Sequence, residues 1–304
     1  MYASIDVGTN TLRLLIGQVS DSKVIPETYF RGITRLGGGF TSQAGLSDTA
    51  MLRTVEKLVE FSEILRSQDI AAVNAVATEA LRRASNATYF QEVVHERSGI
   101  NLEIIPGELE ARLSCAGVLS GLNNVPEHLL IFDIGGGSTE FVYVEAGKPV
   151  FFKSYPLGTV MLCEHHPGEI AQQAHIDRTL RNLQRDLELS GFDYPLPEGV
   201  VPVGTAGTVT TLAAIDMKME RYDWSRVNNY RLDSIALQVI ADKLSSLSVH
   251  EREELSGMEK GRGDLILPGL KITESILDFC CAEELMVSDF GLLEGGLLRA
   301  AGAL

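Results

Sequence analysis

Two short segments of the sequence each place an aspartate just before a glycine-containing turn. They are residues 6–11 (DVGTNT) and residues 133–138 (DIGGGS). Glycine lets a backbone approach a ligand closely, and successive backbone N–H groups in such a turn can bind an anion. A carboxylate beside an anion site is useful where Mg²⁺ lies between the carboxylate and a phosphate. Each segment therefore has the residue types of a phosphate and metal site.

Taken alone, each segment is better explained as a tight β-hairpin, because Gly, Asn and Asp are common in such turns. The two segments, however, form an internal repeat, since an apolar strand precedes each aspartate and another follows each turn at the same offset. A matched pair favours phosphate binding over two unrelated turns, and it predicts two related halves. The expected phosphate ligands from the hairpins are Gly8, Thr9, Asn10, Thr11, Gly135, Gly136, Gly137 and Ser138.

Two more glycine motifs follow along the chain. Residues 204–208 (GTAGT) lie between a predicted strand and a predicted helix, where backbone N–H groups suit an anion. We expect Gly204, Thr205 and Gly207 to contact phosphate, although junctions of this kind also serve packing. Residues 288–296 (SDFGLLEGG) are equally compatible with a nucleotide pocket and with close helix packing.

Carboxylates indicate where a metal ion would bind. Glu140 lies on the strand after the second turn and can hold a metal ion, directly or through water, together with Asp133 and Asp6. A surface position on the strand is the alternative for Glu140. The six histidines lack zinc-binding spacing, and no Ser or Cys motif indicates a covalent nucleophile. The expected cofactor is Mg²⁺ or another divalent cation.

The composition is that of a globular protein of one or two domains. The 304 residues include 26 Lys plus Arg and 41 Asp plus Glu, which gives a net charge of −15. Such a charge repels polyanions at long range, so sequence-independent binding of nucleic acid is not expected. We also expect a cytoplasmic protein, because the four cysteines show no pairing pattern, the N-terminus is unlike a signal peptide and no stretch approaches the roughly 18 apolar residues of a membrane span.

Hydrophobic periodicity predicts strands that alternate with helices, which indicates an α/β fold. Ser47 is a predicted N-cap, and Gly99 is predicted to end a helix. The predicted strands are 2–7, 13–19, 24–30, 71–77, 101–105, 129–134, 140–145, 149–155, 200–204 and 286–291. The predicted helices are 47–68, 87–98, 108–121, 169–189, 232–247 and 292–304, with a turn leading into a further helix over 205–217.

Seven motifs, in this order along the chain, resemble the exopolyphosphatase and guanosine pentaphosphate phosphohydrolase family of the actin, sugar-kinase and heat-shock-chaperone superfamily. They are DVGTNTLRLLI (6–16), ATEALRRASN (77–86), PGELEARLSCAGV (106–118), FDIGGGSTEFV (132–142), PLGTV (156–160), VGTAGTVTTLAA (203–214) and RGDLILPG (262–269). Two departures occur: the first turn reads TNT where the family usually has SNS, and residues 36–40 lack the acidic residue often found there.

The resemblance implies two ribonuclease-H-like domains of the actin-like ATPase superfamily that flank a cleft. Domain I is expected over residues 1–122, joined by a C-terminal helix over about 291–304, and domain II over residues 123–290. The resemblance thus implies the short, two-domain form of the family, without the extra C-terminal helical domain expected of its long members.

The resemblance also assigns roles to Glu110 and Arg82. It implies that Glu110 is the catalytic carboxylate that activates a water, and that Arg82 faces phosphate, which its planar fork suits. Without the resemblance, Glu108 and Glu110 are explained as acids at a solvated helix start. Arg83 is expected to be a solvated charge. The roles of Arg13, Arg112 and Arg262 stay open. Arg262, for example, can contact substrate or pair with Glu259 or Asp264.

The main functional hypothesis is a Mg²⁺-dependent hydrolase that releases terminal phosphate from inorganic polyphosphate. The alternatives are removal of the 5′ γ-phosphate of guanosine pentaphosphate, or an alarmone- or nucleotide-binding regulator without hydrolysis. A sugar kinase or chaperone-like ATPase is disfavoured by the ELEAR and RGDLILPG motifs. The negative net charge favours short polyphosphates over long ones. We expect a small-molecule ligand, no nucleic acid and no membrane, and leave a homodimer open.

Overall fold

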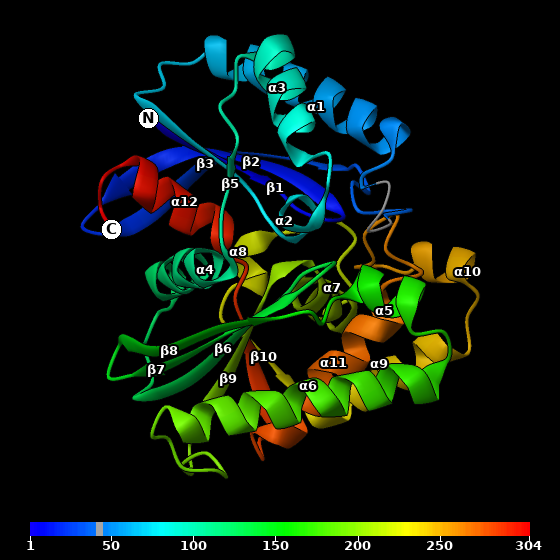
Figure 1. Cartoon of the computed structure of the whole chain (residues 1–304). Coiled ribbons are helices and arrows are strands. Elements are labelled where there is room, and N and C mark those ends of the chain that lie inside the picture. Colours follow the sequence, from blue (N-terminus) through cyan, green and yellow to red (C-terminus); the bar gives the residue numbers. More distant parts are fainter. Residues whose placement is uncertain (41–44) are drawn as a thin grey trace. The chain divides into compact units, whose positions relative to one another are not determined.

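The computed structural model of the chain describes residues 1–40 and 45–304, which divide into two compact units (Figure 1). Unit 1 comprises Met1–Ser120 and Gly291–Leu304, and unit 2 comprises Gly121–Phe290. Each unit has one sheet and one large hydrophobic core of its own. The α/β class that the alternating pattern predicts is confirmed.

Unit 1 is built on a five-stranded sheet with the strand order β3-β2-β1-β4-β5. The first three strands pair antiparallel, whereas β1, β4 and β5 run parallel. The strands are β1 (Tyr2–Val7), β2 (Thr11–Ser20), β3 (Lys23–Ile33), β4 (Ala72–Ala77) and β5 (Glu103–Ile104). The helices are α1 (Asp48–Arg66), α2 (Glu79–Arg83), α3 (Ala87–Ser98), α4 (Gly107–Gly121) and α12 (Leu292–Ala300).

The two faces of the unit 1 sheet are covered by different helices. Ala3 and Ile5 belong to the core cluster that includes residues of α1, and Ser4, which alternates with them, faces α12. A Cβ at Gly296 would lie 2.2 Å from Ser4 Oγ, and one at Gly295 would lie 1.8 Å from the Leu113 carbonyl oxygen. The fourth glycine motif therefore serves close packing of α12, which lies beside the first strands (Figure 1).

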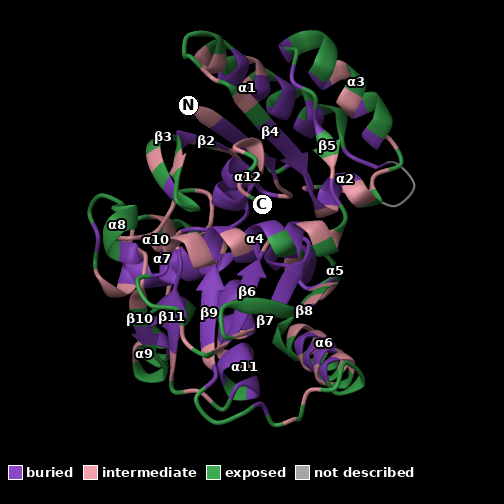
Figure 2. Ribbon diagram, turned by 90° about the vertical axis from the view of Figure 1, so that its left-hand side faces the viewer, coloured by how far each residue is buried: buried purple, intermediate pink, exposed green. Residues whose placement is uncertain are grey.

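Unit 2 is built on a six-stranded sheet with the strand order β10-β11-β9-β6-β7-β8. Its inner strands β6, β7, β9 and β11 are largely buried, whereas the surrounding helices expose one side (Figure 2). The strands are β6 (His128–Ile134), β7 (Thr139–Glu145), β8 (Lys148–Tyr155), β9 (Val201–Thr205), β10 (Tyr230–Asp233) and β11 (Glu284–Val287). The helices are α5 (Thr159–His165), α6 (Glu169–Leu189), α7 (Ala206–Asp216), α8 (Trp224–Val227), α9 (Ser234–Ser245), α10 (Val249–Glu253) and α11 (Ile266–Phe279).

The internal repeat of the sequence is also a repeat of topology. In each unit an antiparallel meander of three strands is followed by a strand that pairs parallel with the first strand of the meander. The two turns are closed by the same hydrogen bond, from Gly8 N to Thr11 O at 3.0 Å and from Gly135 N to Ser138 O at 2.9 Å. This arrangement confirms the ribonuclease-H-like fold class that the resemblance implies.

Some predicted elements differ from those observed. The helix predicted over 232–247 is wrong at its start, because Leu232 lies in β10 and the helix begins only at Ser234. Asp233 ends the strand and caps the helix, since its side chain accepts a hydrogen bond from Ala236 N at 2.7 Å. The strand predicted over 101–105 is reduced to two residues. Helix α3 covers residues 87–98 and helix α6 covers residues 169–189, as predicted.

None of the helices in the described parts of the chain combines the length and the apolar composition needed to cross a membrane.

Candidate active site

The carboxyl edge of the unit 1 sheet gathers the residues that the sequence singled out in this unit. Asp6 is the next-to-last residue of β1, α2 with Arg82 follows β4, and α4 with Glu110 follows β5. Because β1, β4 and β5 are parallel, their carboxyl ends lie at the same edge. Ligands of open α/β sheets bind outside this edge, so the topology itself favours a site here.

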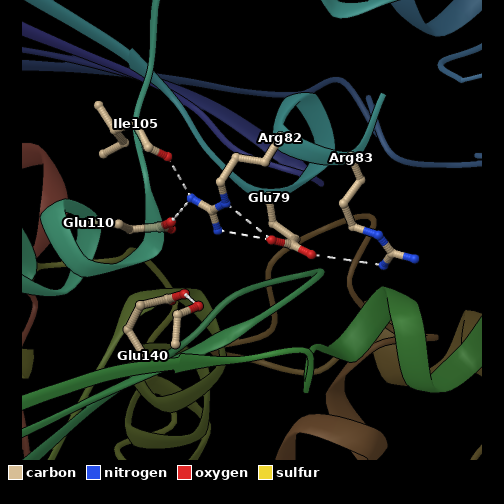
Figure 3. A network of polar contacts seen from close by, with 7 residues as sticks. Glu79, Arg82, Arg83, Ile105, Glu110 and Glu140 are labelled. Carbon is tan, nitrogen blue, oxygen red and sulfur yellow. Dashed lines mark hydrogen bonds and ion pairs between the residues drawn. The ribbon is translucent and has the colours of Figure 1, made fainter. Parts of the chain in front are cut away.

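Glu110 is held by Arg82 (Figure 3). The guanidinium donates from Nη1 to Glu110 Oε2 at 2.5 Å and to the Ile105 carbonyl oxygen at 2.9 Å. Its Nε and Nη2 donate to Glu79 Oε2 at 3.2 and 3.0 Å. Arg82 thus links two carboxylates and the end of β5, which fixes the orientation of the Glu110 carboxylate. Arg83 points elsewhere: it is 45% exposed and lies over the Phe40 ring.

The structure separates the two glutamates at the start of α4. Glu108 is exposed and forms an i,i+4 ion pair with the exposed Arg112 at 3.0 Å, which is the solvated helix start considered above. Glu110 is only 7% exposed. A carboxylate that is buried and held by an arginine is suited to act on a ligand, whereas Glu108 and Arg112 form a surface pair.

The first hairpin contains buried polar atoms that lack a protein partner. Asp6 is 4% exposed, and its Oδ2 accepts hydrogen bonds from Arg13 Nε at 3.0 Å and Nη2 at 2.5 Å. Among the described residues, Asp6 Oδ1, both polar side-chain atoms of Asn10 and Thr34 Oγ1 have no hydrogen-bond partner. Buried polar groups are normally satisfied, so this cluster fits a polar ligand such as phosphate with water.

The backbone of the first turn is held from one side. Gly37 N donates to Thr9 O at 2.8 Å, and Arg35 N donates to Asn10 O at 2.9 Å. In a trans peptide the next N–H points opposite to the carbonyl, so the Asn10 amide faces away from Gly37. A Cβ at Gly37 would lie 2.3 Å from Thr9 Cγ2, which explains a glycine there. The turn therefore presents an amide to a ligand on its open side.

The second turn is held in the same way by helix α5. Thr159 N donates to Gly135 O at 3.1 Å, and Val160 N donates to Gly136 O at 2.9 Å. The amides of Gly136 and Gly137 therefore point away from the α5 N-terminus. Helix α5 begins close against the turn, because a Cβ at Gly158 would lie 2.3 Å from Gly136 O. Two adjacent glycine amides on one side are the geometry of an anion nest.

Two carboxylates occupy opposite positions on β6 and β7. Asp133 pairs with Glu140 in the strand register, so their side chains lie on the same face of the sheet, with Cβ atoms about 5 Å apart. They are 8% and 2% exposed. In the described parts of the chain no three His, Cys, Asp or Glu side chains could hold a metal ion by themselves. Mg²⁺ commonly takes one or two carboxylates, with phosphate oxygens and waters as its other ligands, so this pair fits that ion.

The third glycine motif lies under an arginine. A Cβ at Gly207 would lie 2.1 Å from Arg262 Nη2, so the glycine lets this guanidinium reach the first turn of α7. Arg262 also forms an ion pair with Glu259, which is one of the alternatives that the sequence leaves open. The Thr205 hydroxyl donates to the Phe290 carbonyl oxygen at 2.8 Å and is used within unit 2. The guanidinium of Arg262 therefore lies at the start of α7 while it is paired with Glu259.

The two buried cysteines do not provide a nucleophile for this chemistry. Burial raises the pKa of Cys115 to about 12 and that of Cys280 to about 12, so both thiols stay protonated at neutral pH. A protonated thiol is a poor nucleophile. The buried cysteines are therefore structural, and the polar groups described above carry the candidate chemistry.

Sequence reasoning missed three partners of the predicted residues. Arg13 pairs with Asp6, Glu79 pairs with Arg82, and Ser154 donates to Glu140 Oε1 at 2.6 Å. Glu79 could have been found from its i,i+3 spacing to Arg82 within one helix. The contacts of Arg13 with Asp6 and of Ser154 with Glu140 can be inferred only from the strand register. The hairpin turns fix this register, so it can be predicted only when both ends of each strand are known.

Comparison with known proteins agrees with the fold. A sequence model described as the Ppx/GppA phosphatase family matches residues 22–303. Exopolyphosphatase 2 of Mycobacterium tuberculosis is 31% identical over 99% of this chain and 98% of its own length. A bifunctional 3-dehydroquinate synthase/phosphatase of Fusobacterium nucleatum is 29% identical over 98% of this chain, which spans 46% of that longer protein.

Solved structures give the same result. The crystal structure of the Aquifex aeolicus member of the Ppx/GppA family superposes with a TM-score of 0.79 at 31% identity, covering 99% of this chain and 97% of that one. The family model covers most of the chain, and relatives above 30% identity cover nearly all of it. The chain therefore belongs to the Ppx/GppA phosphatase family.

Proposed function

We propose that the protein is an exopolyphosphatase, which releases the terminal phosphate of inorganic polyphosphate. The observation that carries this proposal is Glu110, a buried carboxylate that Arg82 holds beside the carboxyl edge of the unit 1 sheet. The proposal is supported by the relative named Exopolyphosphatase 2, which matches over nearly its whole length.

Glu110 is proposed as the general base. Its carboxylate accepts a proton from a water, and the water oxygen forms a bond to the terminal phosphorus while the bond from that phosphorus to the bridging oxygen breaks. The bridging oxygen leaves with the electron pair, so the products are inorganic phosphate and a chain shorter by one phosphate. Arg82 keeps the Glu110 carboxylate in one orientation during this step.

The glycine turns are proposed to bind phosphate. Backbone amides in a turn stabilise phosphate oxygens without side-chain reorganisation, so they suit the charge that spreads over these oxygens in the transition state. The proposed ligands in unit 1 are Gly8, Thr9, Asn10 and Thr11, and those in unit 2 are Gly135, Gly136, Gly137, Ser138, Gly204, Thr205 and Gly207. Arg82 is proposed to reach phosphate in addition to its contacts with Glu79 and Glu110.

A divalent cation, Mg²⁺ in the first instance, is proposed to bind carboxylates, which are Asp133 and Glu140 in unit 2 and Asp6 in unit 1. When bound, such a cation would neutralise charge on the phosphate oxygens. Asp133 and Glu140 would supply hard oxygen ligands from a fixed sheet position. The Oδ1 atom of Asp6 offers a buried acceptor, whereas its Oδ2 is used by Arg13.

The second candidate substrate is guanosine pentaphosphate, whose 5′ γ-phosphate is bound through the same kind of anhydride. It is proposed as the alternative because the motifs of the chain resemble a family that includes guanosine pentaphosphate phosphohydrolases, and the chain matches the Ppx/GppA phosphatase family. A regulator that binds nucleotide without hydrolysis is the remaining reading, and the same assay separates it from the two enzymes.

The test is phosphate release at fixed free Mg²⁺ from polyphosphates of defined length, guanosine pentaphosphate and ATP. The variant is Glu110→Gln, and the matched control is Glu108→Gln on the same helix turn. We expect Glu110→Gln to lower kcat by roughly 100- to 10,000-fold, because a positioned general base contributes about that much. Glu108→Gln should retain wild-type kcat, because that side chain is exposed.

The relative kcat/KM values then name the substrate. If phosphate is released from none of the substrates, the proposal of an enzyme is overturned and the regulator is favoured. The Glu110→Gln variant of a regulator would bind nucleotide as tightly as the wild type. Equal activity of Glu110→Gln and Glu108→Gln would overturn the catalytic assignment.

A further inference from the structure

A row of three side chains crosses the meander of unit 2. Asp133 on β6 is opposite Glu140 on β7, and Glu140 is opposite Ser154 on β8. Directly opposite residues share a face of the sheet, so the three side chains lie in line on one face. The Ser154 hydroxyl donates to Glu140 Oε1 at 2.6 Å, within the short range of a charge-assisted O–H···O⁻ bond.

The same row in unit 1 has different chemistry. There Asp6 is opposite Arg13, and Arg13 is opposite Arg31. Arg13 donates twice to Asp6, so the first repeat balances its carboxylate with a cation of the protein. In the second repeat a glutamate replaces that arginine, and a serine hydroxyl replaces Arg31. The row of unit 2 therefore contains two acids, Asp133 and Glu140, and one hydroxyl, that of Ser154, which donates to Glu140.

We infer that Ser154 is a positioning residue that sets the Glu140 carboxylate for a divalent cation. This inference rests on the proposed role of Glu140 as a metal ligand. Glutamate has three side-chain torsions, and a hydrogen bond to one oxygen restricts them so that the carboxylate keeps one orientation. Partners that orient metal ligands in this way contribute roughly 10- to 100-fold to metal affinity or activity.

Ser154 is itself fixed by its surroundings. The pairing of β7 with β8 is regular from Thr139 to Tyr143, and the register shift comes only after that residue. The neighbouring Tyr155 points to the opposite face, where its hydroxyl donates to Asp186 at 2.7 Å. The hydroxyl of Ser154 therefore reaches Glu140 from a rigid strand, which is what a positioning residue requires.

The test measures binding of Mn²⁺ to the purified full chain by the loss of the free-ion EPR signal, which needs no turnover. Mn²⁺ is used as a probe because, like Mg²⁺, it suits carboxylate and water ligands. The variants are Ser154→Ala, Ser154→Thr and Glu140→Gln. The matched control is Tyr155→Phe, which removes a hydroxyl from the same strand on the opposite face.

We expect Ser154→Ala to raise the Mn²⁺ Kd by about 10-fold or more, within the range given above. Ser154→Thr, which keeps the hydroxyl, and Tyr155→Phe should stay within about twofold of the wild type. In the phosphate-release assay, Ser154→Ala should raise the Mg²⁺ concentration for half-maximal rate while the KM for polyphosphate at saturating Mg²⁺ changes little.

Three results would overturn the inference. If Glu140→Gln loses Mn²⁺ binding but Ser154→Ala keeps it, Ser154 does not position the ligand, and the proposed function stands. If Glu140→Gln itself binds like the wild type, the metal assignment under the proposed function fails together with the inference. If Ser154→Thr and Tyr155→Phe lose as much affinity as Ser154→Ala, with lower melting temperatures, the effect is only structural.

Discussion

At the scale of single residues, Arg82 has the widest set of contacts in the candidate site. We predict that Arg82→Lys lowers kcat by about 100-fold, because a lysine keeps the charge but cannot bond at once to Glu79, Glu110 and the Ile105 carbonyl oxygen. The Glu110 carboxylate would then lose its fixed orientation. The measurement is kcat for phosphate release under saturating substrate.

Arg83→Lys is the matched control for this prediction. The two arginines are adjacent in α2 and both contact Glu79, but Arg83 is 45% exposed and its Nη1 lies 3.8 Å from Glu79 Oε1. We expect Arg83→Lys to keep kcat within about twofold, as surface ion pairs contribute little. Equal losses in both variants would show that the fork geometry of Arg82 is not what matters.

The sequence identifies candidate site residues better than it predicts which of them are in contact. Glu108 and Glu110 are indistinguishable by pattern, and only the resemblance favours Glu110 before the structure shows one exposed and one buried. The contact of Arg82 with Glu110 joins residues 28 positions apart, which two parallel strands bring to one edge. Local periodicity cannot predict this contact, because the contact depends on the order of the strands in the sheet.

At the scale of elements, the turn of unit 2 that we propose to bind phosphate depends on where α5 begins. We predict that Gly158→Ala weakens binding of inorganic phosphate by about 10-fold, because the new Cβ would lie within 2.4 Å of backbone atoms of Gly136 and Gly137. Gly158 has φ −138, which any residue adopts, so the effect is steric. The measurement is product inhibition by phosphate in the release assay.

Gly32→Ala, in β3 of unit 1, is the control for this prediction. A Cβ there would meet only the flexible Lys57 side chain, at 3.3 Å, so phosphate inhibition should not change. A Gly158→Ala variant that is inhibited like the wild type would mean that α5 does not set the amides of the turn.

Long elements with a clear period are predictable here, and short ones are not. Helix α6 has the expected bounds because its buried positions recur at helical spacing over 21 residues. Strand β10 was missed because its four residues owe their conformation to pairing with β11, which lies more than 50 residues further along the chain. Similarly, β5 keeps only the two residues that pair with β4. Pairing with a distant strand is a tertiary effect that local propensity does not contain.

At the scale of the whole molecule, the sequence repeat predicts the two sheets. The differences between the two copies lie in the charged residues at matching strand positions. The same strand row carries an acid with two arginines in unit 1 and two acids with a serine in unit 2. The row of unit 1 thus places two cations beside its acid, whereas the row of unit 2 places a second acid and a hydroxyl there. A repeat identifies the common scaffold, whereas function depends on the positions at which the copies differ.

The net charge of −15 leads to a prediction about ionic strength. Raising the salt concentration from about 0.01 M to 0.15 M shortens the Debye length from about 30 Å to about 8 Å. The proposed contacts to the terminal phosphates would be short and partly buried, so salt would screen them little. The distal phosphates of a long polyphosphate lie in the repulsive field of the whole protein, which salt removes. We therefore predict that the KM for long chains falls a few-fold with added salt, while that for short chains stays nearly constant.

The measurement is initial-rate kinetics on chains of defined length at fixed free Mg²⁺, since polyphosphate itself binds that ion. A protein that holds long chains in an extended basic groove responds with the opposite sign, because salt weakens each contact along the groove. A KM for long chains that rises with salt would therefore place a cationic track on this surface despite the acidic composition. It would also remove the reason for expecting a preference for short substrates.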